Sequence, residues 1–164
     1  GDVMKESAQA AYSYVRANAK QLGVDPDFYK KFDVHVHVPA GAIPKDGPSA
    51  GVAMITSIVS LLTNKSVSEG IGMTGEISLR GNVLPIGGLK EKSTAAHRSG
   101  LTHILAPELN EKDLEDIPET VLKDLNITFI KDVSEVLKLS LGIESKEIPK
   151  ARKSTRPPMT AERN

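Results

Sequence analysis

The sequence contains no cysteine and no tryptophan, and aromatic residues make up only 4% of it. The lack of cysteine excludes disulfide scaffolds, thiolate nucleophiles and cysteine-ligated zinc sites. The chain also lacks net charge, because 21 basic side chains balance 21 acidic ones, so no overall field attracts nucleic acid or anionic lipid. The longest apolar stretch, residues 52–62, contains three hydroxyl side chains and is too short to span a bilayer. These absences predict a soluble protein that acts neither in a membrane nor on nucleic acid.

A phosphate-binding loop of the G-x-x-x-x-G-K-[S/T] type is also missing. Gly88 is followed by Leu89, and the spacing between Gly81 and Gly87 does not fit the motif. We therefore expect that this chain does not hydrolyse ATP, and its motifs imply no cofactor and no metal ion.

Apolar residues recur with helical and strand periods along residues 1–142. Spacings of three and four predict helices at 2–22, 50–63, 89–98 and 133–141, and one or two helices within 111–125 that break at Pro118. Alternation and short apolar runs predict strands at 33–38, 72–79, 82–86, 102–106 and 127–130. This mixture predicts one α+β (mixed α/β) domain over residues 1–142, with a twisted mixed sheet flanked by helices. Residues 143–164 are basic and poor in large apolar side chains, which predicts a disordered tail.

A candidate nucleophile stands where a loop meets a helix. Residues 39–48 contain three prolines and two glycines, and Ser49 follows them at the start of the predicted helix 50–63. A helix start offers free N–H groups and the positive end of the helix dipole, which stabilise the oxyanion formed by attack on a carbonyl. Serine is also a preferred N-cap residue, so the local pattern alone favours a capping role for Ser49.

A nucleophilic serine needs a base that removes its proton. No histidine lies in a segment typical of a Ser-His-Asp triad; the four are His35, His37, His97 and His103. Lysine is the other common base, but only when desolvation lowers its pKa from about 10.4 toward neutrality.

The helix at residues 89–98 offers such a lysine. Lys92 shares the apolar face with Leu89 and Ala96, whereas Lys90 is rotated about 200° from it. Lysine is rarely buried without a partner or a function, so this position favours Lys92 as the base. The alternative is a stem that packs on the core while its ammonium group stays in water.

Four blocks of sequence resemble the proteolytic domain of Lon, the ATP-dependent protease, in its bacterial and mitochondrial branch. They are residues 35–39 (HVHVP), 44–51 (PKDGPSAG), 73–81 (MTGEISLRG) and 84–92 (LPIGGLKEK). Several long blocks in matching order make the resemblance specific, and it covers about residues 1–142. It implies the Lon protease-domain fold, whose additional strands are expected to precede Gly1.

The resemblance also assigns roles to residues. It implies that Ser49 is the nucleophile, that Lys92 is the base and that Thr74 hydrogen-bonds the lysine amine. It places Asp46 and Gly47 in a loop whose conformation controls the oxyanion site, with the N–H groups of Gly47 and Ser49 as donors. An Asp46 carboxylate beside Lys92 would hold the lysine protonated and idle, which suggests a loop switch.

Three further residues match the family but are expected to support rather than catalyse. His35 and His37 alternate away from the valines of the same segment and are interpreted as structural residues or as lining of a substrate groove. Glu76 is expected to order the strand region around it.

At the level of the whole protein, the resemblance implies a serine endopeptidase that forms a homo-hexameric ring and degrades unfolded or damaged polypeptides. ATP and Mg²⁺ belong to an ATPase module outside this chain. The expected location is the bacterial cytoplasm or, as an alternative, the mitochondrial matrix. Two other interpretations stay open: a Ser-His-Asp hydrolase with His37 or His97 as base, and a non-catalytic assembly module in which Ser49 caps a helix and Lys92 packs.

Overall fold

The structure is a computed structural model that describes residues 1–39 and 46–144. In chain order its elements are α1 (Asp2–Ala17), α2 (Phe28–Lys31), the 3₁₀-helix η1 (Pro48–Ala50), α3 (Gly51–Thr63), β1 (Ile71–Met73), β2 (Glu76–Ile77), β3 (Val83–Leu84), α4 (Leu89–Arg98), β4 (His103–Pro107), the 3₁₀-helix η2 (Glu108–Asp116), α5 (Glu119–Asp124), β5 (Asn126–Ile130) and α6 (Val133–Leu141). Helices and strands are mixed along the chain, so the predicted α+β class is confirmed.

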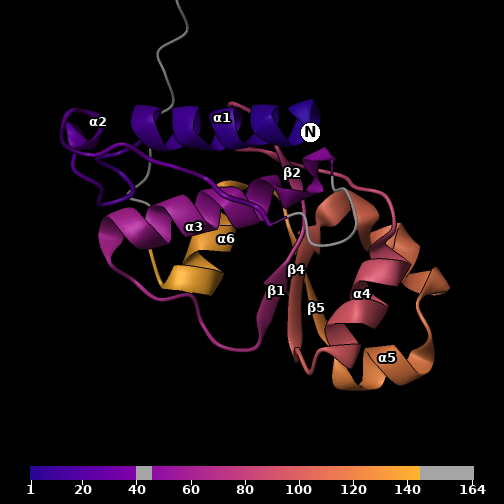
Figure 1. The fold of residues 1–164 in the computed structure, drawn as a ribbon. Helices are drawn as coiled ribbons and strands as arrows, with labels where there is room; N and C mark the ends of the chain where they lie inside the picture. Colours follow the sequence, from indigo (N-terminus) through magenta and orange to yellow (C-terminus); the bar gives the residue numbers. More distant parts are fainter. Residues whose placement is uncertain (40–45, 145–164) are drawn as a thin grey trace, which may run out of the picture.

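The sheet is small and lies in the middle of the molecule. Its three strands are parallel in the order β1-β4-β5, with Met73 opposite Leu105 and Leu105 opposite Thr128. β2 and β3 form a separate antiparallel pair, in which Glu76 faces Leu84. Helices α3 and α6 lie on one side of the three-stranded sheet, and α4 and α5 lie on the other side (Figure 1). The sheet therefore separates two layers of helices.

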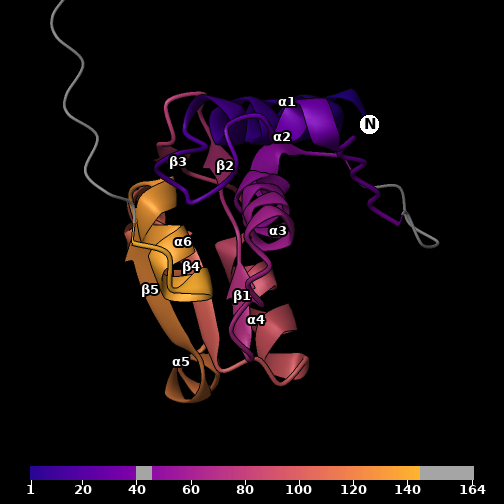
Figure 2. The same ribbon diagram turned by 90° about the vertical axis from the view of Figure 1, so that its left-hand side faces the viewer.

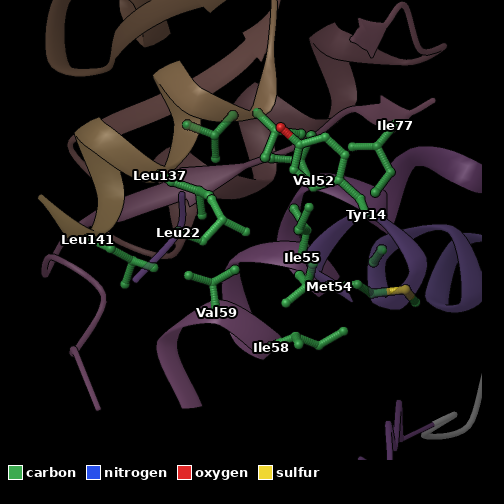
Figure 3. Packing of buried hydrophobic residues seen from close by; sticks show 14 of the residues in the cluster. Tyr14, Leu22, Val52, Met54, Ile55, Ile58, Val59, Ile77, Leu137 and Leu141 are labelled. Carbon is green, nitrogen blue, oxygen red and sulfur yellow. The ribbon is translucent and has the colours of Figure 1, made fainter. Parts of the chain in front are cut away.

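Each layer has its own hydrophobic core. The larger core joins α1, α3 and α6, and its contacts include Val52, Ile55 and Val59 from α3 and Leu137 from α6 (Figure 3). The smaller core lies under α4 and α5. Helix α1 packs against α3 and lies far from α5 (Figure 2). The larger core therefore fixes α3, the helix that follows Ser49.

The helix predictions are largely confirmed. α4 spans the predicted residues 89–98, and α3 and α6 differ from prediction by at most one residue at an end. The first helix is shorter than predicted because it stops at Ala17. There the Asn18 side chain donates a hydrogen bond to the Tyr14 carbonyl, and turns follow as far as Gly23.

Two strand predictions are wrong. Residues 33–38 form no strand, because alternation alone does not supply a partner, and no described segment pairs with them. The predicted strand 72–79 is two strands in different sheets, broken at Thr74 and Gly75. Gly75 has φ +157°, and a Cβ there would lie 2.7 Å from a Val52 methyl group. The break brings Gly75 against the start of α3, where its carbonyl accepts the Val52 N–H.

The end of the described region is still part of the core. Ile143 is buried there, one residue beyond the predicted domain boundary. The disordered tail is predicted for residues 143–164; beyond Ile143 and Glu144 it lies outside the described residues. Within residues 1–39 and 46–144, no helix has both the length and the apolar character needed to cross a bilayer.

The sheet-facing side of α4 buries one hydroxyl without a partner. Ser93 is fully buried, and its Oγ makes no hydrogen bond in the described part of the chain. An unsatisfied buried hydroxyl costs about 1–3 kcal/mol, and alanine is also the better helix former. We expect Ser93→Ala to raise the free energy of unfolding by about 1 kcal/mol, measured by urea denaturation. The matched control is Ser99→Ala, since the exposed Ser99 hydroxyl already donates to the Ala95 carbonyl; a Ser93 variant no more stable than wild type would contradict the prediction.

Candidate active site

Ser49 lies in the 3₁₀-helix η1, which a sharp turn precedes. Gly47 precedes it with φ 156° and ψ 160°, a region of backbone space open essentially to glycine alone. A Cβ at Gly47 would meet nothing within 4 Å, so conformation rather than space requires glycine here. Pro48 then begins the 3₁₀ turn, and α3 continues from it at Gly51. The N–H of Ser49 therefore lies at the open end of a helical segment, where no intrahelical acceptor is available.

The backbone of Ser49 is fixed, while its hydroxyl is not used as a cap. The Ser49 carbonyl accepts a hydrogen bond from the Gly75 N–H at 2.9 Å and one from the Thr74 hydroxyl at 3.3 Å. Neither η1 nor α3 has a side-chain cap, and Ala50 occupies the N-cap position of α3. The capping role favoured by the local sequence is therefore wrong. Ser49 instead lines a pocket.

Lys92 lines the same pocket from the opposite helix. It belongs to α4, whose N-cap Gly88 adopts a left-handed conformation with φ 72°. The predicted orientation of the two lysines of α4 is confirmed, because Lys92 is half-buried at the pocket and Lys90 is exposed. In this structure the Lys92 amine does not hydrogen-bond Ser49. Instead, Lys92 Nζ donates to the Gly87 carbonyl at 3.0 Å.

The pocket shared by Ser49 and Lys92 is mostly apolar. It has a volume of about 450 Å³ and lies between α3, β1 and α4. Its apolar walls come from Ala53, Met73, Ala95, Leu101 and Ile104. Among the described residues that line it, Lys92 is the one ionisable side chain.

Gly72 helps to shape this pocket. A Cβ on Gly72 would lie 2.8 Å from the Leu101 side chain, so the glycine allows Leu101 to approach β1 closely. The sequence analysis did not single out Gly72, Leu101 or the other wall residues, because apolar residues from separate elements form a pocket only after folding.

Asn110 is another residue that the sequence analysis missed. It is buried in η2, and its side chain binds both backbone groups of Ile86: Oδ1 accepts from the N–H at 3.0 Å, and Nδ2 donates to the carbonyl at 2.7 Å. These bonds replace a strand partner for the segment that leads into Gly87, whose carbonyl holds Lys92. A single asparagine between helical residues gives no sequence signal for this role.

The other predicted residues take different partners from those expected. The Thr74 hydroxyl donates to the Ser49 carbonyl rather than to the amine of Lys92. The Asp46 carboxylate accepts from the Met4 N–H at 2.9 Å, and within the described residues no ion pair joins it to Lys92. A side chain's partner depends on tertiary contacts, which explains why sequence position alone did not identify these bonds.

His35, His37 and Glu76 lie outside the pocket of Ser49. Both histidines are exposed and border a neighbouring groove on α3, which shares Ala50 and Ala53 with that pocket. A groove-lining role for the histidines is compatible with this position. Glu76 belongs to β2, and its expected structural role stays a prediction.

His97 has a carboxylate partner but not a serine. Its Nε2 lies 3.0 Å from Asp124 Oδ2, which joins α4 to α5, and His97 does not line the pocket of Ser49. This arrangement disfavours His97 as the base for Ser49. In the described part of the chain, no group of three acidic or histidine side chains is placed to hold a metal ion.

Comparisons of the sequence with known proteins show the family of this chain. The family model of the Lon protease (S16) C-terminal proteolytic domain matches residues 1–143. The chain is 60% identical to Lon protease 1 of Bacillus subtilis over 146 residues, which are 89% of this chain and 19% of that protein. It is 60% identical to Lon protease of Escherichia coli K12 over 144 residues, or 88% of this chain and 18% of that protein.

A third relative extends the match along the chain. Lon protease of Desulfosudis oleivorans is 52% identical over 163 residues, which cover 96% of this chain and 20% of that protein. The chain thus spans about a fifth of the length of these curated relatives. With a family model that covers most of its residues, the chain belongs to the family of Lon C-terminal proteolytic domains.

Proposed function

We propose that this chain is a serine endopeptidase domain in which Ser49 attacks the peptide carbonyl and Lys92 is the general base. The observation that carries the proposal is the shared apolar pocket: Ser49 and Lys92 come from different helices and line it together. Family membership supports peptide-bond cleavage. The Ser49 hydroxyl caps neither η1 nor α3, so it is available for chemistry.

The reaction proceeds in two halves. In the first, neutral Lys92 accepts the proton of Ser49 Oγ while Oγ bonds to the carbonyl carbon; the protonated amine then donates to the leaving nitrogen, which leaves an acyl-enzyme ester. In the second half, Lys92 removes a proton from water as the water oxygen bonds to the ester carbon. The bond to Ser49 Oγ then breaks, Oγ takes the proton back from Lys92, and the acid is released. No metal ion or cofactor takes part in these steps.

Lys92 must change its partner for this chemistry. In the structure its amine donates to the Gly87 carbonyl, so its stem already projects from α4 at the pocket. We propose that the amine turns from Gly87 to Ser49 Oγ in the reactive form. Apo geometry often holds catalytic groups in longer or different contacts, which tighten when substrate binds.

The oxyanion formed on attack needs preorganised donors. We propose that the N–H groups of Gly47 and Ser49 provide them, because both stand at the start of the continuous helical segment η1–α3. Pro48 between them has no N–H, so it does not compete. The positive end of the helix dipole adds to this stabilisation.

The apolar walls set the substrate class of the pocket. We propose that it binds an uncharged, medium-sized side chain next to the cleaved bond. Among the described residues the pocket offers no carboxylate to a cationic side chain, and an anionic side chain would hold the Lys92 amine protonated. Leu101→Ala is expected to enlarge the pocket and to raise the kcat/KM ratio for a phenylalanine peptide over a leucine peptide by roughly 10-fold. Parallel assays of two fluorogenic peptides measure this ratio. Leu122→Ala, on the surface of α5, is the control. An unchanged ratio in Leu101→Ala would show that Leu101 does not contact the bound substrate side chain.

Beyond the domain itself, we propose that the full-length protein resembles its relatives. Lon-type chains couple the protease to an ATPase module, and we infer that this domain likewise receives unfolded polypeptide in a homo-hexameric ring. The bacterial relatives favour the bacterial cytoplasm as its location.

Covalent capture tests the proposed function. The protein is incubated with a fluorophosphonate, digested, and analysed by mass spectrometry for the modified residue. We expect one adduct on Ser49. Modification of Ser99, the other serine that lines the pocket, would replace the assignment, and the absence of any adduct would favour a non-catalytic module.

A further inference from the structure

Asn110 binds a distant stretch of backbone in the way that a neighbouring strand would. Its side chain is 3% exposed, and its amide joins η2 to Ile86, 24 positions earlier in the chain. Oδ1 accepts the Ile86 N–H at 3.0 Å, and Nδ2 donates to the Ile86 carbonyl at 2.7 Å. A strand partner offers the same pair of an acceptor and a donor. The side-chain amide therefore holds the backbone beyond β3, which ends at Leu84.

Asp113 fixes the direction of this amide. Its Oδ2 accepts the second hydrogen of Asn110 Nδ2 at 2.6 Å. If the amide were reversed, Asn110 Oδ1 would face both the Asp113 carboxylate and the Ile86 carbonyl, with no hydrogen between these acceptors. The amide is thus held in the one orientation that makes both bonds to Ile86.

The segment after Ile86 depends on bonds at its two ends for its shape. Gly87 and Gly88 have no side chains to pack, and Gly88 has the left-handed φ of 72° with which α4 begins. At one end, the first helical bond of α4 runs from the Lys92 N–H to the Gly88 carbonyl. At the other end, Asn110 binds Ile86. The bonds of Asn110 therefore set where the Gly87 carbonyl points and where α4 starts.

The Lys92 amine depends on that carbonyl. Lys92 Nζ donates to the Gly87 carbonyl at 3.0 Å, in a position open to solvent. A lysine amine that has no acceptor in the protein extends into water. The Gly87 carbonyl thus keeps the amine beside the pocket that Ser49 also lines, where the proposed change of partner to Ser49 Oγ starts.

We propose that Asn110 is a positioning residue for the base Lys92. By holding Ile86 it fixes the Gly87 carbonyl, and this carbonyl keeps the amine within reach of Ser49. The inference rests on the proposed function and adds to it a residue outside the substrate pocket, since neither Asn110 nor Ile86 is among the described residues that line that pocket. Asn110 therefore acts on the chemical step rather than on substrate binding.

Two substitutions test this role by the separate effects on kcat and KM. Asn110→Ala removes both bonds to Ile86 and should lower kcat by roughly 10–100-fold, because displacement of a reacting group by about 1 Å has effects of this size. KM on a short peptide should stay within about 3-fold, because the pocket walls keep their contacts. Asp113→Ala leaves both bonds to Ile86 in place and only loosens the amide, so its kcat should fall by about 3-fold.

A double-mutant cycle with Lys92→Met separates positioning of the amine from a general loss of structure. If Asn110 acts through the amine, Asn110→Ala should slow labelling of Ser49 by less than about 2-fold in the Lys92→Met background, because residues that act as a unit are not additive. The rate of fluorophosphonate labelling, followed over hours for the slow variants, measures this. A purely structural role would give the same fold loss in both backgrounds.

The matched control is Val121→Ala. Val121 is 4% exposed in the small core under α4 and α5, so its truncation should lower the melting temperature while it leaves the bonds of Asn110 intact. Its kcat should stay within about 3-fold of wild type. All variants are compared at one temperature below the lowest melting temperature. If Asn110→Ala does not fold, Asp113→Ala takes its place in the cycle.

The results decide the proposal in either direction. A loss of kcat in Asn110→Ala that disappears in the Lys92→Met background supports it. The same fold loss in both backgrounds, a loss no greater than in Val121→Ala, or a variant faster than wild type overturns it. Wild-type protein that is never labelled at Ser49 would instead count against the proposed function, so the two failures are distinguishable.

Discussion

Ser49→Ala is expected to reduce peptide hydrolysis by a factor on the order of 10⁴ or more, because the covalent intermediate cannot form without the hydroxyl. Any residual rate would come from the pocket and the oxyanion donors acting on water. The structure gives the substitution little else to disturb, because the Ser49 carbonyl keeps its bonds to Gly75 and Thr74 and the hydroxyl caps no helix. Steady-state assays on a fluorogenic peptide measure the loss, and the unfolding temperature should stay near that of wild type.

Ser99→Ala is the matched control for this variant. Ser99 lines the same pocket, but its hydroxyl donates to the Ala95 carbonyl within α4. We expect its loss to change kcat by less than about 3-fold, in line with a substitution outside the reacting groups. A larger loss in Ser99→Ala than in Ser49→Ala would reverse the assignment of the nucleophile.

Lys92→Met should produce the second large effect, again on the order of 10⁴-fold in kcat, because nucleophile and base act as one unit. Methionine keeps most of the apolar stem that packs at the pocket and removes only the amine. The acylation rate, followed by single-turnover labelling of Ser49, should fall together with kcat. Binding of an uncleavable peptide should change little.

Two further variants are controls that test whether Lys92 rather than another residue is the base. Lys90→Met changes the exposed lysine of the same helix and should leave acylation intact. His97→Ala should lower stability slightly through loss of its contact with Asp124, without loss of acylation. Full acylation in Lys92→Met, or its disappearance in His97→Ala, would move the base to another residue.

The sequence predicted the helices of the fold better than its strands, for a physical reason. α3, α4 and α6 follow from periodicity within each segment, which local spacing reveals. A strand needs a partner, and residues 33–38 have none among the described residues. The break at Gly75 was equally hidden, because it arises from close packing against Val52 in α3.

For the candidate site, the sequence predicted which way a side chain faces better than which group it bonds. The face argument placed Lys92 on the apolar side of its helix and Lys90 on the other side, and in the structure Lys92 lines the pocket while Lys90 is exposed. The partners of Thr74 and Asp46 were not foreseen, because a hydroxyl or carboxylate bonds whichever group folding brings near. The support from Asn110 depends on η2 lying against Ile86, which no local pattern predicts.

A crystal structure of the protein with a peptide boronate bound to Ser49 tests the central claim most directly. The account predicts that Lys92 Nζ leaves the Gly87 carbonyl and lies within about 3.2 Å of Ser49 Oγ, the reach of a hydrogen bond. A boronate on Ser49 with the Lys92 amine still on Gly87 or in solvent would contradict it.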